Sequence, residues 1–270
     1  MNLTSPSQVK DWCIRNGFHP NKVLGQNFLI DQNALKAIVD AGLEGFDAEG
    51  VEVLEIGPGL GVLTEEMLAR GAKVTAIEKD PVLAERLKSA LGNPEGLTVI
   101  AGDAIDVIER PEVYGTDVSK FAVMVSNLPY QAGTRILLEF VQRHAIKQMT
   151  VLVQTEVAER LAAGPGSKTR GLAGVWAQLD YDVKIVRKVS ASCFWPRPEI
   201  GSSVVRLVRH ERNIDISVEE RKLFYSLTKR AFEHRRKQLG SIFKDMIQST
   251  ARAEELSNQD WLELTKGLMQ

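Results

Sequence analysis

The chain has 270 residues, a formal net charge of −1, 44% apolar residues and 26% charged residues, a composition that is typical of a globular protein and argues against disorder. No stretch approaches the roughly 18 uninterrupted apolar residues that a membrane helix needs, and the first residues contain no apolar run of signal-peptide length, so we expect a cytoplasmic protein. The two cysteines, Cys13 and Cys193, lie far apart in the sequence and predict neither a disulfide framework nor a metal site.

The charges are distributed unevenly along the chain. Residues 40–126 contain 17 acidic and 7 basic side chains, whereas residues 184–244 contain 15 basic and 6 acidic ones. Such a basic segment is typical of proteins that bind a phosphate backbone, because each Lys or Arg that neutralises a phosphate releases condensed counterions. The alternative interpretation is a solvated helical face.

Short apolar runs alternate with helical stretches over most of the chain. The runs predict strands at residues 51–56, 73–77, 97–100, 121–125 and 149–153. One helix is predicted to begin near Val62, and another covers residues 80–91, with Asp80 as its N-cap and Pro81 at its first position. This alternation indicates an α/β fold, with a mostly parallel, Rossmann-like sheet and helices on both faces.

The pattern changes toward the end of the chain. Two more extended stretches, residues 183–190 and 203–208, predict that the sheet finishes with antiparallel strands at one edge. From Ser217 onward the sequence is typical of helices alone. We therefore expect a large α/β domain over residues 1–211 and a small all-α domain over residues 212–270.

A glycine-rich turn follows the first predicted strand. Glycines at 57, 59 and 61 permit tight bends and a close approach of a ligand beyond the carboxyl ends of the strands, where open α/β sheets bind their ligands. The spacing is G-x-G-x-G rather than the G-x-G-x-x-G of dinucleotide folds, and no Gly-Lys-Ser/Thr follows to bind a triphosphate. A purely structural turn is the alternative.

Two carboxylates follow the next two strands. Glu78 stands about 20 residues past the glycine turn, where a carboxylate can accept both hydroxyls of a ribose, and Asp103 is placed to accept a hydrogen bond from an adenine amino group. The structural alternative for Glu78 is a surface acid that caps the next helix. The structural alternative for Asp103 is a turn residue. With the glycine turn, the pair outlines a pocket for a nucleoside without phosphates, the form of S-adenosylmethionine.

The fourth strand leads into Asn127-Leu128-Pro129-Tyr130. This set suits methylation of an exocyclic amine on an aromatic ring, whose delocalised lone pair makes it a poor nucleophile. If the Asn127 side-chain oxygen and the Leu128 carbonyl accept its two hydrogens, the lone pair turns toward the sulfonium methyl group. Tyr130 can stack on the base, and catalysis would come from alignment and fixed dipoles without a metal.

These residues belong to seven ordered segments that resemble the ribosomal RNA adenine N6,N6-dimethyltransferases of the small subunit. The segments are 25–29 (GQNFL), 54–61 (LEIGPGLG), 78–80 (EKD), 102–104 (GDA), 127–130 (NLPY), 194–198 (FWPRP) and 235–237 (RRK). The resemblance covers nearly the whole chain and implies a class I methyltransferase fold. Residues 1–211 would then bind S-adenosylmethionine and perform catalysis, and residues 212–270 would contact rRNA.

The resemblance also implies individual roles. Asn27 and Leu29 would cover the cofactor, Gly57 would lie against its methionine part, Glu78 would hold the ribose and Asp103 the adenine. Asn127 would lie at the reacting end of the cofactor and, with Leu128 and Tyr130, would handle the target adenine. Phe194 resembles a second aromatic wall, with core packing as its structural alternative.

The implied activity is the dimethylation at N6 of two adjacent adenosines near the 3′ end of small-subunit (16S) rRNA, and we expect a monomer that acts on an assembling 30S particle. One alternative is the large-subunit rRNA adenine methyltransferase that confers macrolide resistance. Another is a non-catalytic RNA-binding assembly factor with the same fold. The basic segment 232–237 is a candidate contact with the rRNA backbone, with a solvated helix face as its alternative.

Two segments depart from the family pattern. Residues 131–134 read Gln-Ala-Gly-Thr where relatives more often carry Asn-Ile-Ser/Thr, and Arg170 stands where a Tyr is common. Both segments are expected to border the RNA entrance, so they bear on how RNA fits and not on the cofactor residues.

Overall fold

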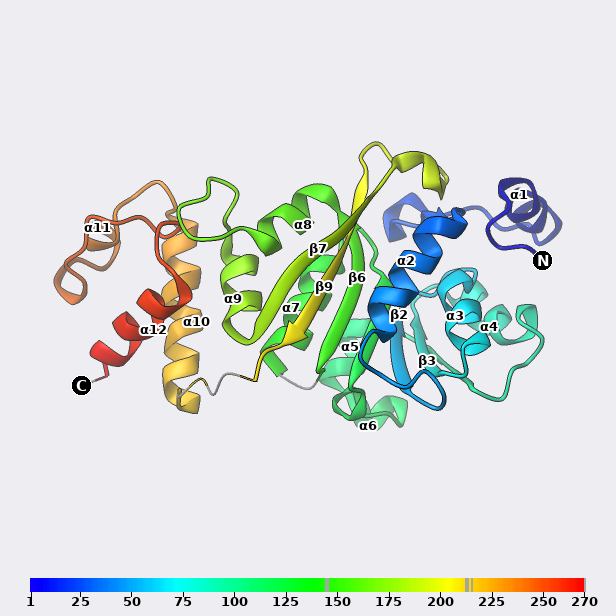
Figure 1. Cartoon of the computed structure of the whole chain (residues 1–270), viewed down its shortest axis with the longest axis horizontal. Helices are drawn as coiled ribbons and strands as arrows, with labels where there is room; N and C mark the ends of the chain where they lie inside the picture. The colour runs from blue at the N-terminus through cyan, green and yellow to red at the C-terminus, as the bar shows by residue number, and fades with distance from the viewer. Residues whose placement is uncertain (144–145, 212–213, 215, 270) are drawn as a thin grey trace. The chain divides into compact units, whose positions relative to one another are not determined.

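The computed structural model describes residues 1–143, 146–211, 214 and 216–269 (Figure 1). The chain forms two compact units. The first, the sheet unit, contains Met1–Ala158 and Lys184–Val208, and the second, the helical unit, contains Glu159–Val183 and Arg209–Gln270. The predicted boundary at residue 212 falls outside the described residues, and the helical unit also contains residues 159–183, which the sequence did not assign to it.

The sheet has seven strands in the order β4-β3-β2-β5-β6-β9-β7. Their bounds are β2 (Glu52–Ile56), β3 (Lys73–Glu78), β4 (Leu97–Ala101), β5 (Val123–Asn127), β6 (Gln148–Gln154), β7 (Tyr181–Val189) and β9 (Ser202–Arg209). The strands from β4 to β6 pair in parallel, and β9 pairs with β6 in antiparallel register. The predicted strands, their parallel arrangement and the antiparallel pairing near one edge are confirmed.

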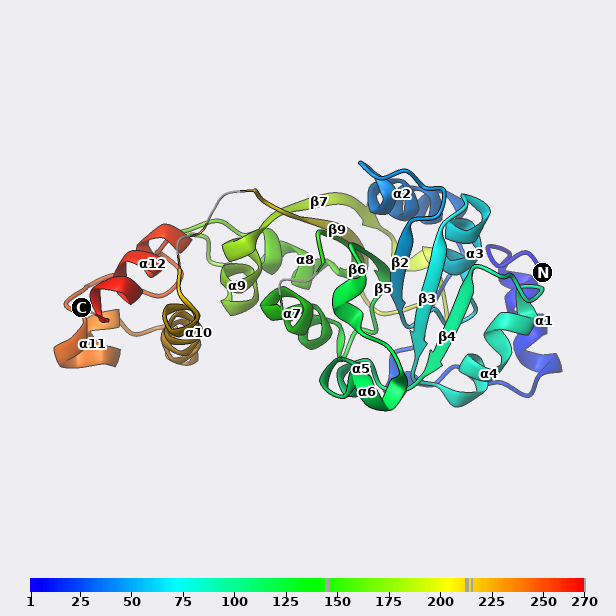
Figure 2. The ribbon, with the colours of Figure 1, turned by 90° about the horizontal axis from the view of Figure 1, so that it is seen from below.

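Helices cover both faces of this sheet. Figure 2 shows α2 (Gln32–Leu43) and α3 (Val62–Ala69) on one side and α5 (Ala104–Glu109) and α7 (Gly133–Arg143) on the other. The helix predicted at residues 80–91 is α4 (Pro81–Ala90), and the Asp80 carboxylate accepts hydrogen bonds from the amides of Val82 and Leu83 as an N-cap. Apolar side chains of α2 and α3, such as Ile38 and Met67, are buried against Val53 and Val125 of the sheet.

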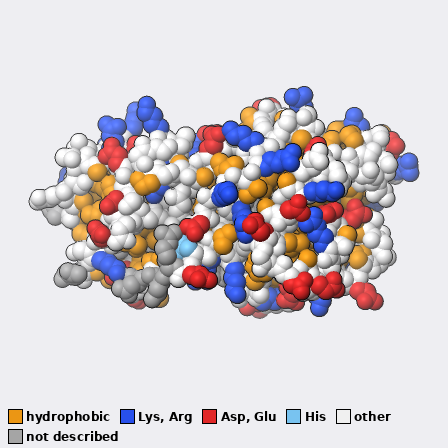
Figure 3. Space-filling model, viewed as in Figure 1, with side chains coloured by type: hydrophobic (Ala, Val, Ile, Leu, Met, Phe, Trp, Pro, Cys, Tyr) orange, Lys and Arg blue, Asp and Glu red, His pale blue; other side chains and the backbone are white. Residues whose placement is uncertain are grey.

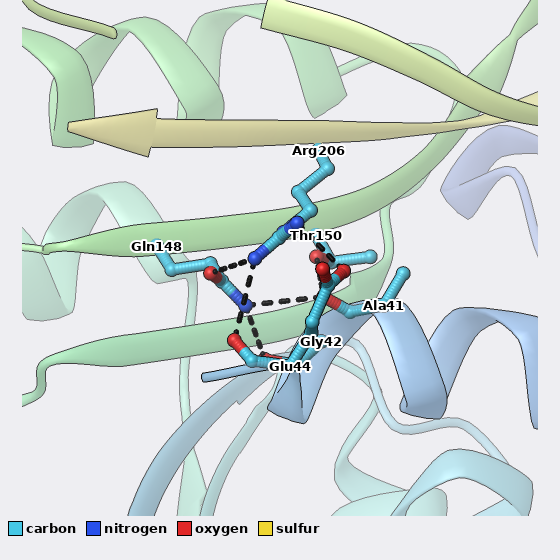
Figure 4. A network of polar contacts seen from close by, with 6 residues as sticks. All are labelled: Ala41, Gly42, Glu44, Gln148, Thr150 and Arg206. Atoms are coloured by element: carbon cyan, nitrogen blue, oxygen red, sulfur yellow. Dashed lines mark hydrogen bonds and ion pairs between the residues drawn. The ribbon is translucent and has the colours of Figure 1, made fainter. Parts of the chain in front are cut away.

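The carboxyl end of α2 is fixed to the sheet by polar side chains (Figure 4). Gln148 donates to the carbonyls of Ala41 and Gly42 at 3.0 and 2.8 Å. Arg206 donates to the Gln148 side-chain oxygen at 2.8 Å and pairs with Glu44 at 2.6 Å. Helix ends leave carbonyls without partners, so these contacts satisfy the end of α2 and fix the helix that follows the predicted cofactor segment 25–29.

Two short strands from distant parts of the chain form a separate two-stranded sheet in the sheet unit. β1 (Phe28–Leu29) pairs antiparallel with β8 (Phe194–Trp195), with Leu29 opposite Phe194. The helix α1 (Pro6–Arg15) precedes them, and its Val9 and Cys13 lie in one apolar cluster with Phe28. Segments that are far apart in the sequence therefore build one wall of the sheet unit together.

The helical unit has a core of its own. It contains α9 (Leu172–Asp180), α10 (Val218–Glu233), α11 (Leu239–Phe243) and α12 (Asn258–Gly267). Ser217 and Ser257 begin α10 and α12 with capping boxes, which fix both starts. Leu179, Phe224 and Trp261 are among its buried apolar residues. Among the described residues, no helix combines the length and the apolar character needed to cross a bilayer.

Candidate functional site

A cavity of about 450 Å³ lies at the carboxyl ends of β2, β3, β4 and β5, within the size range of sites for small molecules. Of the predicted site residues, the following line the cavity: Asn27, Leu29, Gly57, Glu78, Asp103, Asn127, Leu128 and Tyr130. Phe194 does not belong to this lining. Parallel strands end at the same edge of a sheet, which is why residues from four separate loops meet here.

The glycine turn forms one side of the cavity. Gly57 and Gly59 have φ values of 67° and 58°, in the left-handed region that favours glycine. A Cβ atom added to Gly59 would lie 3.1 Å from the ring of Phe28. The turn therefore requires glycine both for its backbone conformation and for its close packing.

Glu55 lies beneath this turn and is 1% exposed. Thr64 donates a hydrogen bond to its carboxyl group at 2.6 Å. Burial raises the pKa of Glu55 to about 8, against the lowering effect of the Thr64 hydrogen bond. In the absence of a ligand, Glu55 therefore holds a proton near neutral pH.

Glu78 ends β3 and lines the cavity next to the glycine turn. Its two carboxylate oxygens accept hydrogen bonds from the amides of Gly59 at 3.0 Å and Asp80 at 2.8 Å. Burial raises the pKa of Glu78, whereas these two amides lower it. Each oxygen can accept a second hydrogen bond, so Glu78 remains able to take the two hydroxyls of a ribose while it orients the glycine turn.

Asp103 follows β4 and is the N-cap of α5. One carboxylate oxygen accepts from the amide of Ile105 at 2.8 Å, and the other lies 2.7 Å from the Lys79 ammonium. Burial acts to raise the pKa of Asp103, but the contacts with Lys79 and Ile105 outweigh it, so the pKa lies below its usual value. Asp103 is thus an ionised acceptor that also has the structural role of a turn residue.

Asn127 and Leu128 present two acceptors at the end of β5. The side-chain nitrogen of Asn127 donates to the backbone carbonyl of Asn27 at 3.2 Å, and the amide of Leu128 donates to the carbonyl of Leu152 at 3.2 Å. Within the described part of the chain, the Asn127 side-chain oxygen and the Leu128 carbonyl have no hydrogen-bond donor. These two oxygens are those that the sequence predicted to hold the target amine.

The ring of Tyr130 is held from its far end. The Tyr130 hydroxyl lies 2.7 Å from the hydroxyl of Ser202 on β9. Burial raises the pKa of Tyr130, and the Ser202 contact opposes that shift, so the phenol is neutral at physiological pH. A ring fixed in this way can serve as a stacking surface without losing rotational freedom when a base binds.

Phe194 lies outside the cavity lining. It is 2% exposed, belongs to the main apolar core and pairs with Leu29 in the short β1-β8 ladder. The structure thus gives it a packing role and brings it to the site only through Leu29. Its role as a second aromatic wall stays a prediction.

Several lining residues were missed by sequence reasoning. They include Leu3, Val23, Leu60, Lys79, Ile105 and Arg135. Lys79 and Ile105 directly follow strand-end residues that were recognised, so their positions carried a usable signal. Leu3 and Val23 reach the cavity only because the first 24 residues fold over it, and no local pattern indicates that.

The two departing segments lie in different places. Gln131 and Ala132 line the cavity. Arg170 is 1% exposed and donates to the Ala163 carbonyl at 2.8 Å and to Asn258 at 2.9 Å, within the helical unit. Its guanidinium is therefore withdrawn from solvent, and a contact of this segment with RNA would have to come from exposed neighbours such as Lys168.

The basic segment 232–237 lies in the helical unit, where Figure 3 shows Lys and Arg side chains along the upper edge. Arg235 donates to the carbonyl of Lys168 and lies 3.6 Å from Glu254. Arg236 and Lys237 are exposed, and neither has an ion-pair partner in the described part of the chain. Of the three Lys and Arg residues in this segment, Arg235 therefore has internal contacts, whereas Arg236 and Lys237 face solvent.

Comparison with known proteins decides the family. The family model of the ribosomal RNA adenine dimethylases matches residues 17–264. The chain belongs to this family. Membership confirms the class I methyltransferase fold and the predicted enzyme class, an rRNA adenine dimethyltransferase that uses S-adenosylmethionine.

Relatives within the family cover most of the chain. A protein of Deinococcus radiodurans named ribosomal RNA small subunit methyltransferase A is 46% identical over 209 residues, which are 76% of this chain and 67% of the relative. A protein of the same name from Staphylococcus haemolyticus is 36% identical over 267 residues, 98% of this chain and 88% of the relative.

Two solved structures share the fold. A dimethyladenosine transferase from Plasmodium falciparum has a TM-score of 0.71 and 24% identity, covering 87% of this chain and 95% of that one. The 23S rRNA methyltransferase ErmE has a TM-score of 0.68 and 23% identity, covering 90% and 100%. At this identity the two structures establish the architecture and not the choice of substrate.

Proposed function

We propose that this family member dimethylates N6 of two adjacent adenosines near the 3′ end of small-subunit rRNA. The observation that carries the proposal is the pair of acceptors at the end of β5, the Asn127 side-chain oxygen and the Leu128 carbonyl, which have no donor in the described structure. An exocyclic amine with two hydrogens is the chemical partner that such a pair fits. The small-subunit names of the relatives support the choice of rRNA.

The cavity residues fit S-adenosylmethionine. Gly57, in the left-handed region, leaves room for a close approach of the methionine part, and Glu78 keeps acceptor capacity for the ribose hydroxyls. Asp103 supplies an ionised acceptor for the adenine amino group. The cofactor has no phosphate, and the glycine turn is not followed by the lysine that a triphosphate site requires.

The reaction requires that a weak nucleophile be aligned. When bound, S-adenosylmethionine supplies an electrophilic methyl group on a sulfonium. In the first transfer, Asn127 and Leu128 accept the two hydrogens of the adenine N6, which favours a pyramidal nitrogen whose lone pair points at the methyl carbon. In the second transfer, the monomethylated nitrogen has one hydrogen left, which one of the two acceptors receives. Tyr130 stacks on the base, and Ser202 holds that ring in place. Such positioning and fixed dipoles can supply a large part of a rate enhancement.

The orientation of the Asn127 side-chain amide depends on the backbone carbonyl of Asn27. Because the Asn127 amide nitrogen donates to this carbonyl, the Asn127 oxygen is turned toward the remaining space of the cavity, where an acceptor is needed. The segment that covers the cofactor therefore also sets the orientation of the group that receives the target amine.

The proposal includes the setting of the reaction. The substrate would be rRNA within an assembling 30S particle, in the cytoplasm, with the chain acting as a monomer and without a metal. The exposed Arg236 and Lys237 would contact the rRNA backbone, because cations that have no internal partner can neutralise phosphates. Segments of this kind contribute to affinity and not to the choice of base.

The test uses purified protein, labelled S-adenosylmethionine and small subunits from cells that lack the modification. We expect label in N6,N6-dimethyladenosine at two adjacent positions near the 3′ end, detected by mass spectrometry of nuclease fragments. Large subunits and their rRNA serve as the parallel substrate. Label in the large-subunit rRNA alone would favour the macrolide-resistance activity, and binding without transfer to either particle would favour a non-catalytic assembly factor.

A further inference from the structure

Arg135 is a cation at the cavity that no role described above explains. It lines the cavity and its side chain is exposed. Among the described residues, the lining contains two cations, Arg135 and Lys79, and Lys79 is paired with Asp103 at 2.7 Å. In the described residues Arg135 has no ion pair and no side-chain hydrogen bond. Its charge is therefore available to a ligand.

The position of Arg135 is fixed by its place on α7. The amides of Ala132 and Gly133 donate to the Pro129 carbonyl at 3.2 and 2.7 Å, so the helix begins within one turn of Tyr130. Arg135 is the third residue of this helix, and its neighbour Ile136 is buried at 4% exposure. A helix rises about 1.5 Å per residue, which keeps Arg135 close to the residues that hold the target base.

The other charged side chains in the described lining are mostly acidic. Five carboxyl groups line the cavity, Glu55, Glu78, Asp103, Asp106 and Glu109, against the two cations. Burial raises the pKa of Glu55 to about 8, which favours its neutral form at neutral pH. Asp106 is paired with Arg110 at 3.0 Å. Glu109 is exposed and has no such partner among the described residues. An RNA strand that enters here meets acidic groups, and within the described part of the lining Arg135 is the cation without an ion-pair partner.

We propose that Arg135 binds a phosphate of the target RNA strand, next to the adenosine held at Asn127 and Tyr130. This inference rests on the proposed function and adds a binding contact to it. A guanidinium matches the geometry of a phosphate and can donate two parallel hydrogen bonds to it. The contact would fix the register of the strand while the base is read elsewhere.

The cofactor carboxylate is the competing ligand for Arg135. Arg135 is an exposed residue of the cavity lining, so its charge is available both to a ligand in the cavity and to an RNA strand outside it. The substitution series below separates the two ligands, because one affects the affinity for RNA and the other the affinity for the cofactor.

The test compares Arg135→Ala, Arg135→Lys and Arg143→Ala with the wild type. Arg143 lies on the same helix, pairs with Glu139 at 3.9 Å and does not line the cavity, so it controls for loss of charge from α7. We would measure kcat/KM for unmethylated small subunits over a range of KCl concentrations, and the dissociation constant for S-adenosylmethionine by calorimetry.

We expect Arg135→Ala to lower kcat/KM about tenfold at low salt and to reduce the slope of log kcat/KM against log salt by roughly one. Arg135→Lys should recover part of the loss and the full slope, and Arg143→Ala should behave as wild type. An unchanged salt slope in Arg135→Ala, or a weakened cofactor affinity that accounts for the whole loss, would overturn the phosphate contact. A wild-type protein that transfers no label would instead overturn the proposed function, which is read separately from the variants.

Discussion

The side-chain nitrogen of Asn127 donates a hydrogen bond to the backbone carbonyl of Asn27 at 3.2 Å. These residues are 100 positions apart, and the bond joins the end of β5 to the segment predicted to cover the cofactor. Because the nitrogen is engaged, the side-chain oxygen of Asn127 is left for the target amine. This one hydrogen bond thus connects the segment predicted to cover the cofactor with the side chain predicted to orient the target base.

Asn127→Ala removes both the acceptor and the contact with Asn27. We expect kcat to fall by about a hundredfold or more, the loss that follows removal of one fixed dipole from an active site, while binding to small subunits is retained. Single-turnover transfer with labelled cofactor would measure the chemical step. Asn127→Asp is the matched control, because it keeps the acceptor but replaces the donor by a second oxygen that repels the Asn27 carbonyl. Near-normal turnover of Asn127→Ala would show that the amide is dispensable.

Tyr130 allows the ring to be separated from its hydroxyl. Tyr130→Phe loses only the contact with Ser202, so we expect kcat/KM to fall about fivefold, the usual effect of one neutral hydrogen bond. Tyr130→Ala also loses the stacking surface, which contributes about 1 to 3 kcal/mol per base, and should lose substantially more. Ser202→Ala should behave as Tyr130→Phe does. If Tyr130→Phe were as inactive as Tyr130→Ala, the hydroxyl rather than the ring would be the essential group.

Asp103 has two roles that one pair of substitutions can separate. Asn at this position can still cap α5, but its side-chain nitrogen replaces the oxygen that now contacts Lys79 and cannot accept a hydrogen bond from adenine. We therefore expect Asp103→Asn to weaken cofactor binding about tenfold with little loss of stability. Asp103→Ala should weaken binding and also cost about 1 kcal/mol of stability through the lost cap. Calorimetry would measure the cofactor affinity, and chemical denaturation the stability. Full cofactor affinity in Asp103→Asn would mean that Asp103 serves only as the N-cap of α5.

The sequence sufficed for the sheet and for most of the site because both follow from local patterns. β-branched runs predict buried strands, and the residues just past them, Gly57, Glu78, Asp103 and Asn127, converge since parallel strands end at one edge. Long-range packing explains the rest. The assignment of residues 159–183 to the helical unit depends on contacts such as that between Arg170 and Asn258, and an arginine in a polar segment carries no local sign that it will be buried.

Glu55 should make the stability of the cofactor-free protein depend on pH. Its pKa is raised from an ordinary value of 4.5 to about 8 by burial, so the folded state keeps a proton that the unfolded state releases between these values. The stabilising contribution is complete below pH 4.5, declines as pH rises, and is fully lost above pH 8, with a slope of about −1.4 kcal/mol per pH unit between these values. Glu55→Gln keeps an acceptor for Thr64 and does not titrate, so it should flatten this slope.

Chemical denaturation at several settings from about pH 5 to about pH 8 would measure how the pH dependence of stability differs between Glu55→Gln and the wild type. Other carboxyl groups titrate in both proteins and cancel in the comparison. Glu78 also has a raised pKa, and its charge helps to raise the pKa of Glu55, so Glu55→Gln removes this coupling together with the titration of Glu55. Equal slopes would mean that Glu55 is ionised in the folded protein despite its burial.

The cations of the basic segment 232–237 should have two different roles, RNA binding and stabilisation of the helical unit. Arg236 and Lys237 face solvent, so replacing both by Ala should weaken binding to small subunits and lower the salt slope by roughly two, with cofactor affinity unchanged. Arg235 instead contacts Lys168 and Glu254, so Arg235→Ala should mainly lower the stability of the helical unit, by about 1 kcal/mol.

Lys222 supplies the control for the loss of positive charge. It is an exposed cation near the start of α10, whereas Arg236 and Lys237 follow the end of that helix. Lys222→Ala removes the same charge from the same helical unit and should leave the salt slope close to that of wild type. Binding titrations over a range of KCl concentrations would measure the slopes, and thermal denaturation the stabilities. If Arg235→Ala changed the slope as much as the double substitution does, its internal contacts would have to open when RNA binds. The three cations would then act as one phosphate-binding cluster.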